Sequence, residues 1–555
     1  MLNLTSASRV LSGDMLLHLT RRRRTTLTGL LACLVASTAV ACGGSLQPSS
    51  SPTFRASASP IDSASPIAVS PPQTFPPLPI AAASPTESSC DKGPSQPPKP
   101  GVPNGWPVML GDVNELPRIG PDGTSYLVQD MSLVALDATG REPAGWPVKL
   151  RIAPIDSTGY APTDVEVGPD GTVYVTGGDT IEAFHPNGTR VAGWPYRASR
   201  ILYPADVATL LPVAQGLYTN INPGEAVLLG MDGVPRPGWP VSLPSAADGS
   251  PSASLLIGPD GTLYGEDQTA DTIYAYGSDG ALKPGWPLQG WAAMTFDPSG
   301  RIYVWKHRFA PSNGARYSGP AVETQIGALD AAGRFYPGWP MKFDGPASPP
   351  TFGPDGTVYV TRGTSYGPGN PKGSGASATI LAFDRTGNPR PGWPVSLPAG
   401  YWVAGSFPAV SQAASDPPVV TPDGSVYVIA AAADSSGAPP SQAIFAFLPS
   451  GRPAPGWPRA IGASQLSNVM FGPTGFGWLI AGSGIYLVSD NRILALQPDG
   501  TVAAGWPLSR PCGASPQSVE QTPDGGLLVL WNAGAKPYDG TLEIRYRPDG
   551  SVAGT

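Results

Sequence analysis

Beyond about residue 100, short apolar stretches alternate with tight turns in an order that repeats along the chain. In the second copy, polar and apolar side chains alternate as in a half-buried strand, and Pro169-Asp170-Gly171 then provides a turn in which glycine supplies a positive φ. Two stretches rich in β-branched and aromatic residues follow, and Pro186-Asn187-Gly188 forms the next turn. Four strands are therefore expected, at residues 164–167, 172–176, 180–184 and 189–196.

The same unit recurs with a fixed tripeptide, Gly-Trp-Pro. Its nine tryptophans are Trp106, Trp146, Trp194, Trp239, Trp286, Trp339, Trp393, Trp457 and Trp506. Successive copies are 40 to 64 residues apart, and from the second copy onward a turn glycine lies six residues before each Trp. Four strands per copy at this period predict the blades of a β-propeller. We expect an all-β fold over residues 101–555 with about nine four-stranded blades. Eight blades are the alternative, because the third copy has Gln215-Gly216 where Pro-Asp-Gly is expected.

The ends of the repeat array predict how the ring closes. The last unit stops at Thr555, where the next Trp is due, whereas the Gly-Trp-Pro of Trp106 precedes any blade of its own. The N-terminal strand is therefore expected to complete the last blade, which removes an open sheet edge. The repeated Trp is interpreted as packing between blades, since aromatic burial dominates such cores. A ladder of ligand-stacking rings is the alternative.

The N-terminus has the pattern of an export signal. The basic cluster Arg21–Arg24 precedes the uncharged, mostly apolar Thr25–Ala41, and small residues precede Cys42. This ending resembles the lipobox of bacterial lipoproteins, in which the Cys is lipidated. We expect a signal peptide at 1–41, lipidation at Cys42, a disordered Ser/Pro-rich tether at 42–100 and a position on the outer face of the cytoplasmic membrane. An uncleaved membrane anchor and a start at Met15 are alternatives.

Cysteine and histidine usage excludes common metal and redox motifs. The four cysteines and three histidines are too widely spaced for a zinc or C-x-x-C motif. Thiols outside the cytoplasm oxidise. A disulfide between Cys90, just before the closing strand, and Cys512, in the unit it completes, is therefore predicted, with two free thiols as the alternative. A net charge of -7 gives no basic footprint for nucleic acid.

Insertions point to one face of the ring. The two turn glycines are 17 residues apart in the first two units and 33 in the fifth, which places the extra residues between the second and third strands. Insertions on one face are typical of a binding face. The candidate binding residues are Lys306, His307, Arg308, Arg316, Tyr317, Arg362, Tyr366, Lys372, Tyr401 and Trp402. Plain surface loops and the central channel are the alternatives.

The stretches Ala135-Leu136-Asp137-Ala138-Thr139-Gly140 and Ala328-Leu329-Asp330-Ala331-Ala332-Gly333 resemble quinoprotein-like (PQQ-like) propeller repeats, over about residues 101–555. In that family the Trp follows the Gly by four residues, and here by six. The quinoprotein dehydrogenases stack their cofactor on a bridge between neighbouring cysteines and hold a Ca²⁺; this chain has neither neighbouring cysteines nor a calcium loop. The resemblance therefore implies a shared scaffold without a cofactor.

The function expected from the sequence is that of a lipid-anchored, non-enzymatic binding or assembly platform for a protein or carbohydrate ligand. One-sided insertions without a compact catalytic motif, such as G-x-S-x-G, favour it. The alternative is a propeller enzyme, either a quinone-cofactor oxidoreductase or a polysaccharide-active enzyme, because such enzymes gather residues from several blades.

Overall fold

The computed structural model describes most of the predicted repeat region. The described residues are 105–110, 117–129, 131–152, 163–198, 209–222, 224–243, 253–267, 270–309, 321–363, 378–398, 401–403, 417–432, 441–461, 477–481, 484–488, 492–509, 514–535 and 538–553. The predicted signal peptide and tether, the lipidation site Cys42 and the predicted disulfide between Cys90 and Cys512 lie outside them.

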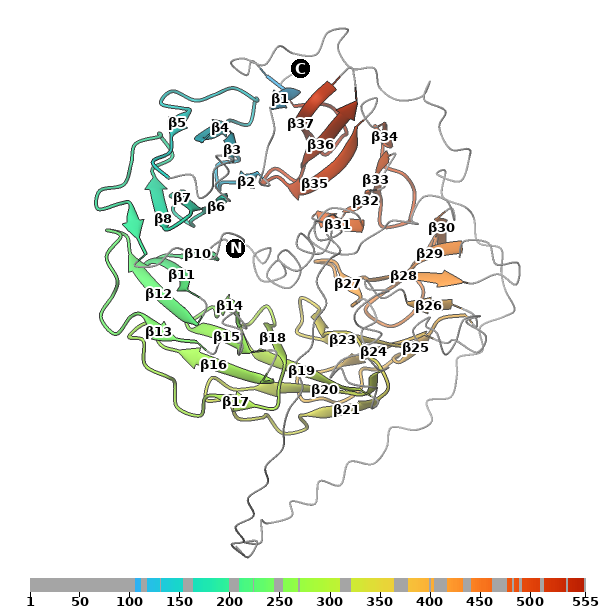
Figure 1. The fold of residues 1–555 in the computed structure, drawn as a ribbon. Helices are drawn as coiled ribbons and strands as arrows, with labels where there is room; N and C mark the ends of the chain where they lie inside the picture. The colour runs from blue at the N-terminus through green and yellow to red at the C-terminus, as the bar shows by residue number, and fades with distance from the viewer. Residues whose placement is uncertain are drawn as a thin grey trace, which may run out of the picture.

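The described residues form nine antiparallel sheets around a common centre, which is the architecture of a β-propeller (Figure 1). We number the sheets along the chain. Sheet 1 is β2 (Arg118–Ile119), β3 (Ser125–Gln129), β4 (Ser132–Leu136) and β5 (Val148–Lys149). Sheet 2 is β6 (Thr163–Val167), β7 (Val173–Gly177), β8 (Thr180–Phe184) and β9 (Tyr196–Arg197). Sheet 3 is β10 (Leu210–Val213), β11 (Gly216–Asn222), β12 (Glu225–Gly230) and β13 (Val241–Ser242). Sheet 4 is β14 (Ala253–Ile257), β15 (Leu263–Asp267), β16 (Thr272–Tyr276) and β17 (Leu288–Gln289).

The remaining sheets repeat this order. Sheet 5 is β18 (Ala293–Phe296), β19 (Ile302–Phe309), β20 (Ala321–Leu329) and β21 (Met341–Asp344). Sheet 6 is β22 (Thr351–Phe352), β23 (Val358–Gly363), β24 (Ala378–Phe383) and β25 (Val395–Ser396). Sheet 7 is β26 (Tyr401–Val403), β27 (Val419–Val420), β28 (Val426–Ala432), β29 (Ser441–Phe447) and β30 (Arg459–Ile461), with β26 and β27 both paired to β28. Sheet 8 is β31 (Gly477–Ala481), β32 (Gly484–Val488), β33 (Arg492–Leu496) and β34 (Leu508–Ser509).

The last sheet joins the two ends of the described chain. Sheet 9 has the order β1-β37-β36-β35, from β1 (Val108–Leu110), β35 (Ser515–Gln521), β36 (Leu527–Ala535) and β37 (Tyr538–Tyr546). In the pairing of β1 with β37, Val108 lies opposite Glu543. Figure 1 shows the blue β1 beside the red β37. The N-terminal strand therefore lies in the sheet built by the C-terminal strands.

The repeated tryptophans connect neighbouring sheets. All nine indoles are 5 to 8% exposed, and in sheets 1 to 8 a Tyr of the same sheet packs on the indole with ring centroids 5.2 to 5.5 Å apart. Each indole Nε1 donates a hydrogen bond to a carbonyl in the turn before the outer strand of the next sheet. The pairs are Trp106–Ala138, Trp146–Pro186, Trp194–Met231, Trp239–Ser278, Trp286–Ala331, Trp339–Arg385, Trp393–Pro449, Trp457–Pro498 and Trp506–Pro548.

The turn glycines explain the fixed spacing between turn and Trp. Gly188 has φ +81, and a Cβ there would lie 2.5 Å from the carbonyl oxygen of Gly145, the glycine of the preceding Gly-Trp-Pro. Two neighbouring sheets thus approach through glycine backbones. Gly188 therefore leaves no room for a side chain, and its positive φ is a conformation that residues with a side chain rarely adopt.

Two predictions about single units were wrong. The fourth strand is not continuous: in sheet 2, Arg190 forms an isolated bridge with Phe184, the Gly-Trp-Pro occupies a bend, and β9 begins only at Tyr196. In most units an aromatic residue of the second strand follows a first-turn glycine by three residues, as Tyr126 follows Gly123, and this spacing predicts Trp478 for the second strand of sheet 8. Trp478 lies instead on β31, the first strand. Tyr486 of β32 packs on Trp506 instead, with ring centroids 5.2 Å apart.

The predicted insertions are also partly strand. In the fifth unit, the inserted residues between the second and third strands extend both strands. β19 continues to Phe309 and β20 begins at Ala321, with Lys306 opposite Gln325 and Arg308 opposite Glu323. The side chains of this stretch alternate between the two faces of the sheet, which continues the ladder. The third unit, in which Pro-Asp-Gly is replaced, forms a complete sheet in which Tyr218 packs on Trp239.

Candidate functional site

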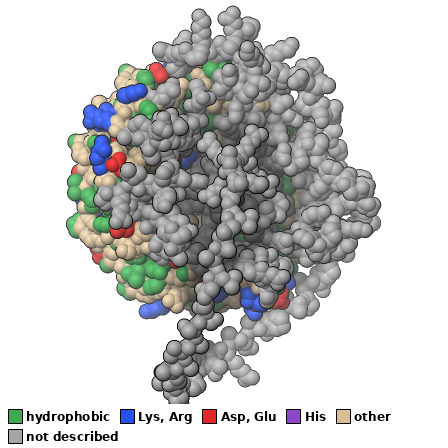
Figure 2. Space-filling view, in the orientation of Figure 1, with side chains coloured by type: hydrophobic (Ala, Val, Ile, Leu, Met, Phe, Trp, Pro, Cys, Tyr) green, Lys and Arg blue, Asp and Glu red, His purple; other side chains and the backbone are tan. Residues whose placement is uncertain are grey.

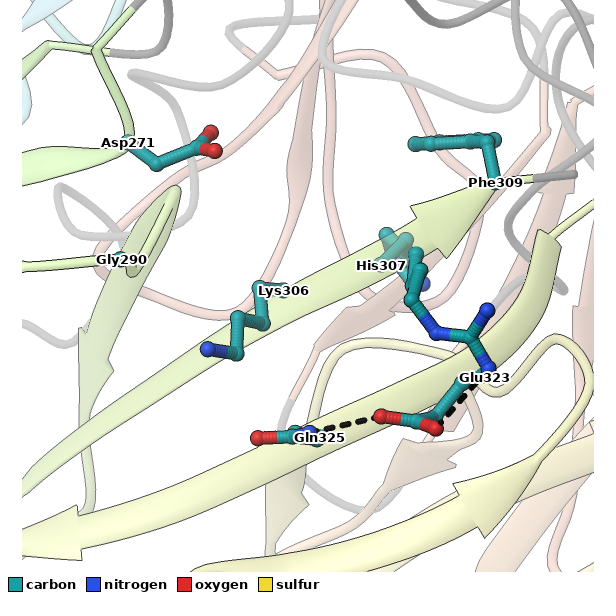
Figure 3. Close-up of a pocket in the computed structure, with 8 residues that line it drawn as sticks. Asp271, Gly290, Lys306, His307, Phe309, Glu323 and Gln325 are labelled. Atoms are coloured by element: carbon teal, nitrogen blue, oxygen red, sulfur yellow. Dashed lines mark hydrogen bonds and ion pairs between the residues drawn. The ribbon is translucent and has the colours of Figure 1, made fainter. Parts of the chain in front are cut away.

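A crevice opens between sheets 4 and 5. We call it the 4–5 crevice; it has a volume of about 360 Å³, within the range of small-molecule sites. Its lining residues are Asp271, Gly290, Lys306, His307, Arg308, Phe309, Glu323 and Gln325 (Figure 3). Sheet 5 supplies one wall from the ends of β19 and β20, and the residues beside β16 and β17 of sheet 4 supply the other.

Strand alternation creates the polar wall. Along β19, Ile302 and Val304 pack in the apolar cluster that also holds Trp286 of sheet 4. Lys306 and Arg308 follow on the same face because side chains two residues apart share a face. The wall is therefore apolar near the middle of the sheet and becomes cationic where the strands extend beyond their neighbours in sheet 4.

The ammonium group of Lys306 lies over an aromatic ring. Its Nζ is 4.6 Å from the centroid of Trp291, an indole that is 5% exposed. The ring face stabilises the cation without neutralising it. Among the described residues, Lys306 forms no ion pair with a carboxylate.

Glu323 is neutralised by its own sheet. Its carboxylate accepts hydrogen bonds from Gln325 at 2.7 Å and Arg308 at 3.2 Å, and Lys342 lies 2.7 Å away. Burial alone would raise the pKa of Glu323, but the bonds from Lys342, Gln325 and Arg308 outweigh it and lower the pKa to about 2. Glu323 therefore stays ionised and holds the guanidinium of Arg308, whose side chain remains 65% exposed.

Asp271 faces these groups from sheet 4. Its φ of +49 puts it in the left-handed region, and its carbonyl accepts hydrogen bonds from the backbone N–H groups of Gly290 and Trp291, at 2.6 and 2.9 Å. Met131, at the same turn of sheet 1, has φ +58, so the left-handed turn belongs to the repeat. The carboxylate is particular to sheet 4, and Figure 3 shows it directed across the crevice toward the Lys306 wall.

His307 contributes little charge. Its Nδ1 is 3.0 Å from the hydroxyl of Thr324, the residue opposite it in the ladder. Burial lowers the pKa of His307 to about 4, so the ring is neutral at neutral pH.

The boundary between sheets 5 and 6 differs at the equivalent position. Arg362 lies three residues after Tyr359, as Lys306 lies three after Tyr303. The guanidinium of Arg362 donates to the carbonyl of Asp344 in sheet 5, at 3.2 Å. This cation is used in a contact between sheets, whereas Lys306 faces a cavity.

The structure brings together three of the predicted site residues, Lys306, His307 and Arg308. Tyr401 lies on β26 of sheet 7, where its ring packs on Phe445 at 5.1 Å, and Trp402 follows it on the same strand. The other candidates, Arg316, Tyr317, Tyr366 and Lys372, lie outside the described residues. The sequence did not single out Asp271, Glu323 and Gln325. A signal existed in the alternation Val322-Glu323-Thr324-Gln325, but only the strand register places it opposite Lys306 and Arg308.

The central channel carries a second charged cluster. Figure 1 shows β2, β6, β10, β31 and β35 as the strands of their sheets that lie toward the centre. Arg118 of β2 donates to Glu166 of β6 at 2.8 Å, and its guanidinium lies 3.6 Å from Asp164 and 3.8 Å from Glu520 of β35. Burial acts to lower the pKa of Arg118, and the carboxylates of Glu166, Asp164 and Glu520 outweigh it and raise it. The cluster links sheets 9, 1 and 2, and its cation, Arg118, is already paired with three carboxylates.

Several other classes of site are absent from the described part of the chain. It holds no group of three or more His, Cys, Asp or Glu side chains placed to bind a metal ion. None of its segments is a helix long and apolar enough to cross a membrane. In Figure 2, the coloured part of the visible face mixes basic, acidic and apolar side chains without an extended basic patch.

No family model and no curated protein matches the chain. Among solved structures, it is similar to virginiamycin B lyase from Staphylococcus aureus (12% identity, 59% of this chain and 95% of that one, TM-score 0.30). It is also similar to a eukaryotic initiation factor (11%, 76% and 91%, 0.41) and to the Dos1 propeller (10%, 80% and 95%, 0.39). The propeller architecture of this chain follows from its own nine sheets.

Proposed function

We propose that this chain is a lipid-anchored, extracytoplasmic β-propeller that acts as a non-enzymatic binding platform and takes its ligand in the 4–5 crevice. The observation that carries the proposal is the cationic wall of Lys306 and Arg308 in a cavity of about 360 Å³. The wall lies on the face where the sequence places its insertions.

The platform in this proposal is one closed ring of nine blades. The nine Trp–carbonyl bonds support it, since each sheet donates to the next and Trp106 of sheet 9 donates to Ala138 of sheet 1 at 3.0 Å. The seam has further contacts: Arg545 donates to the carbonyl of Gly123, and Ser125 donates to Glu543. A ring without open edges resists pairing with other chains.

The anchor forms the second part of the proposal. Residues 1–41 serve as the signal peptide, Cys42 carries the lipid, and residues 42–100 tether the propeller at residues 101–555 to the membrane. A Cys90–Cys512 disulfide would fasten the tether beside sheet 9. The relation to quinoprotein-like repeats is proposed for the scaffold alone.

The chemistry of the crevice supports binding over turnover. Catalysis by a side chain needs an acid, base or nucleophile placed to react. In the lining, Glu323 is held by three donors and His307 is bonded to Thr324. A site of this kind recognises polar and charged groups.

Co-sedimentation with insoluble cell-wall polysaccharide tests the proposed function. The detergent-solubilised full chain should sediment with the polymer, and the double variant Lys306→Gln/Arg308→Gln should stay in solution. Arg334→Gln is the matched control, because it removes an exposed cation of sheet 5 in a turn before the outer strand, away from the crevice. Sedimentation that the double variant retains would refute the crevice as the site. Release of new reducing ends would establish the alternative, a polysaccharide-active enzyme.

A further inference from the structure

The 4–5 crevice has a surplus of positive charge. Lys306 and Arg308 line it and Lys342 lies beside it, whereas the acidic side chains of the lining are Glu323 and Asp271. Glu323 is already paired with Arg308 and Lys342, so Lys306 supplies a positive charge that its own wall does not balance. A ligand with a negative group gains a charge-assisted hydrogen bond there.

The other lining groups suit a ligand rich in hydroxyls. The amide nitrogen of Gln325 donates to Glu323, and Figure 3 shows its oxygen on the far side, below Lys306. Asp271 presents a carboxylate from the opposite wall, and carboxylate oxygens accept several hydrogen bonds. The ring of Phe309 lies at the end of β19, on the rim of the crevice.

The backbone of the polar wall is paired on its β20 side. Lys306 to Phe309 pair with Gln325 to Ala321 in the β19–β20 ladder, and β20 pairs in turn with β21. An extended peptide that binds by adding a strand needs a free sheet edge. β18 pairs with β19 only from Ile302 to Trp305, so the ladder leaves the other edge of Lys306 to Phe309 uncovered by β18. The side chains of the lining, and not the ladder, therefore favour a ring with polar substituents, and an acidic peptide is the competing ligand.

We propose that the 4–5 crevice binds an anionic sugar unit, a pyranose ring that carries a carboxylate. The carboxylate contacts Lys306 and the hydroxyls contact Gln325 and Asp271, while Arg308 and Phe309 border the site where β19 ends. This inference rests on the proposed function and names its ligand class.

Isothermal titration with two matched trisaccharides tests the ligand class. Trigalacturonate carries carboxylates where galactotriose carries hydroxymethyl groups. The solubilised full chain should bind trigalacturonate and not galactotriose, and Lys306→Gln should weaken the binding by roughly tenfold or more. The affinity should also fall as salt is added, because a partly exposed ion pair is screened. Arg334→Gln should bind like the wild type.

Each contrary result has a definite meaning. No binding of trigalacturonate, equal binding of galactotriose, or full affinity in Lys306→Gln would overturn the sugar assignment. Binding of triglutamate in place of trigalacturonate would assign the crevice to acidic peptides. If trigalacturonate fails while sedimentation with wall polymer still depends on Lys306 and Arg308, the proposed function stands and only the ligand class is refuted.

Discussion

At the scale of single residues, a glycine can be required for its positive φ or for the lack of room for a Cβ, and experiment can separate these two effects. Gly188 and Gly345 have nearly the same φ, +81 and +79, but a Cβ at Gly188 would lie 2.5 Å from the carbonyl oxygen of Gly145, whereas nothing lies within 4 Å at Gly345. Gly345→Ala should lower the free energy of unfolding by ~1–2 kcal/mol, and Gly188→Ala by ~2–5 kcal/mol. Urea denaturation measures both. Equal losses would show that the close approach of the two sheets is wrong.

A second prediction at this scale concerns a buried carboxyl group. Glu543 is 0% exposed and accepts a hydrogen bond from Ser125 at 2.7 Å. Burial raises the pKa of Glu543 to about 7; the bond from Ser125 acts to lower it and the nearby charge of Glu520 adds to the increase. The folded state then holds a proton that the unfolded state releases above its usual pKa of about 4.3.

The sign of the pH effect follows from that difference. Stability attributable to Glu543 is complete below about pH 4.3 and is lost as the pH rises toward 7. Glu543→Gln keeps an acceptor for Ser125 and removes the penalty. The variant should be more stable than the wild type at pH 8, by up to ~3 kcal/mol, and nearly equal to it at pH 4.5. Urea denaturation across this pH range measures the difference, and a gap that does not change with pH would contradict the buried carboxyl.

At the scale of elements, the predictable part is what each unit repeats. A turn glycine followed three residues later by a tyrosine predicts six of the nine units well, because one spacing fixes both the turn and the buried ring. In sheet 8 the same rule selects Trp478, and the structure uses Tyr486. In the eighth unit the extra residues come before β31, so the whole unit begins later in the chain. The spacing from a glycine to an aromatic residue cannot distinguish residues inserted before the first strand from residues inserted after it.

The crevice illustrates why a site is harder to predict than its scaffold. Lys306 and Arg308 were singled out as basic residues in an insertion. They form one wall only because β19 continues to Phe309 and because the strand register places Glu323 and Gln325 opposite them. Asp271 comes from another sheet altogether. Contacts between elements are set by packing, which a single unit of the repeat does not encode.

Arg118 carries the prediction at the scale of elements. It contacts carboxylates on β6 and β35, so Arg118→Gln leaves Glu166, Asp164 and Glu520 without their cation. We expect the free energy of unfolding to fall by ~1–3 kcal/mol. Arg197→Gln is the control, since Arg197 is 58% exposed and 3.8 Å from Asp179, and should change it by less than ~0.5 kcal/mol. Denaturant titration compares the free energies of unfolding of the two variants. Equal losses would show that Arg118 does not link the inner strands.

At the scale of the whole molecule, the proposed closure of the ring would make the two ends of the repeat array part of one structure. Trp106 and Trp239 make equivalent bonds, to Ala138 at 3.0 Å across the seam and to Ser278 at 2.9 Å within the ring. If the ring is closed, Trp106→Phe and Trp239→Phe should each cost ~1–3 kcal/mol, because each leaves a carbonyl without its donor. Equilibrium unfolding in urea measures this. A neutral Trp106→Phe beside a damaging Trp239→Phe would mean an open seam.

The central proposal is one ligand site on the ring, between sheets 4 and 5. A crystal structure of the full chain soaked with trigalacturonate tests this most directly. We expect electron density for a sugar ring in the crevice, with a carboxylate within hydrogen-bonding distance of Nζ of Lys306. An empty crevice with the sugar bound in the central channel or against sheet 7 would contradict it.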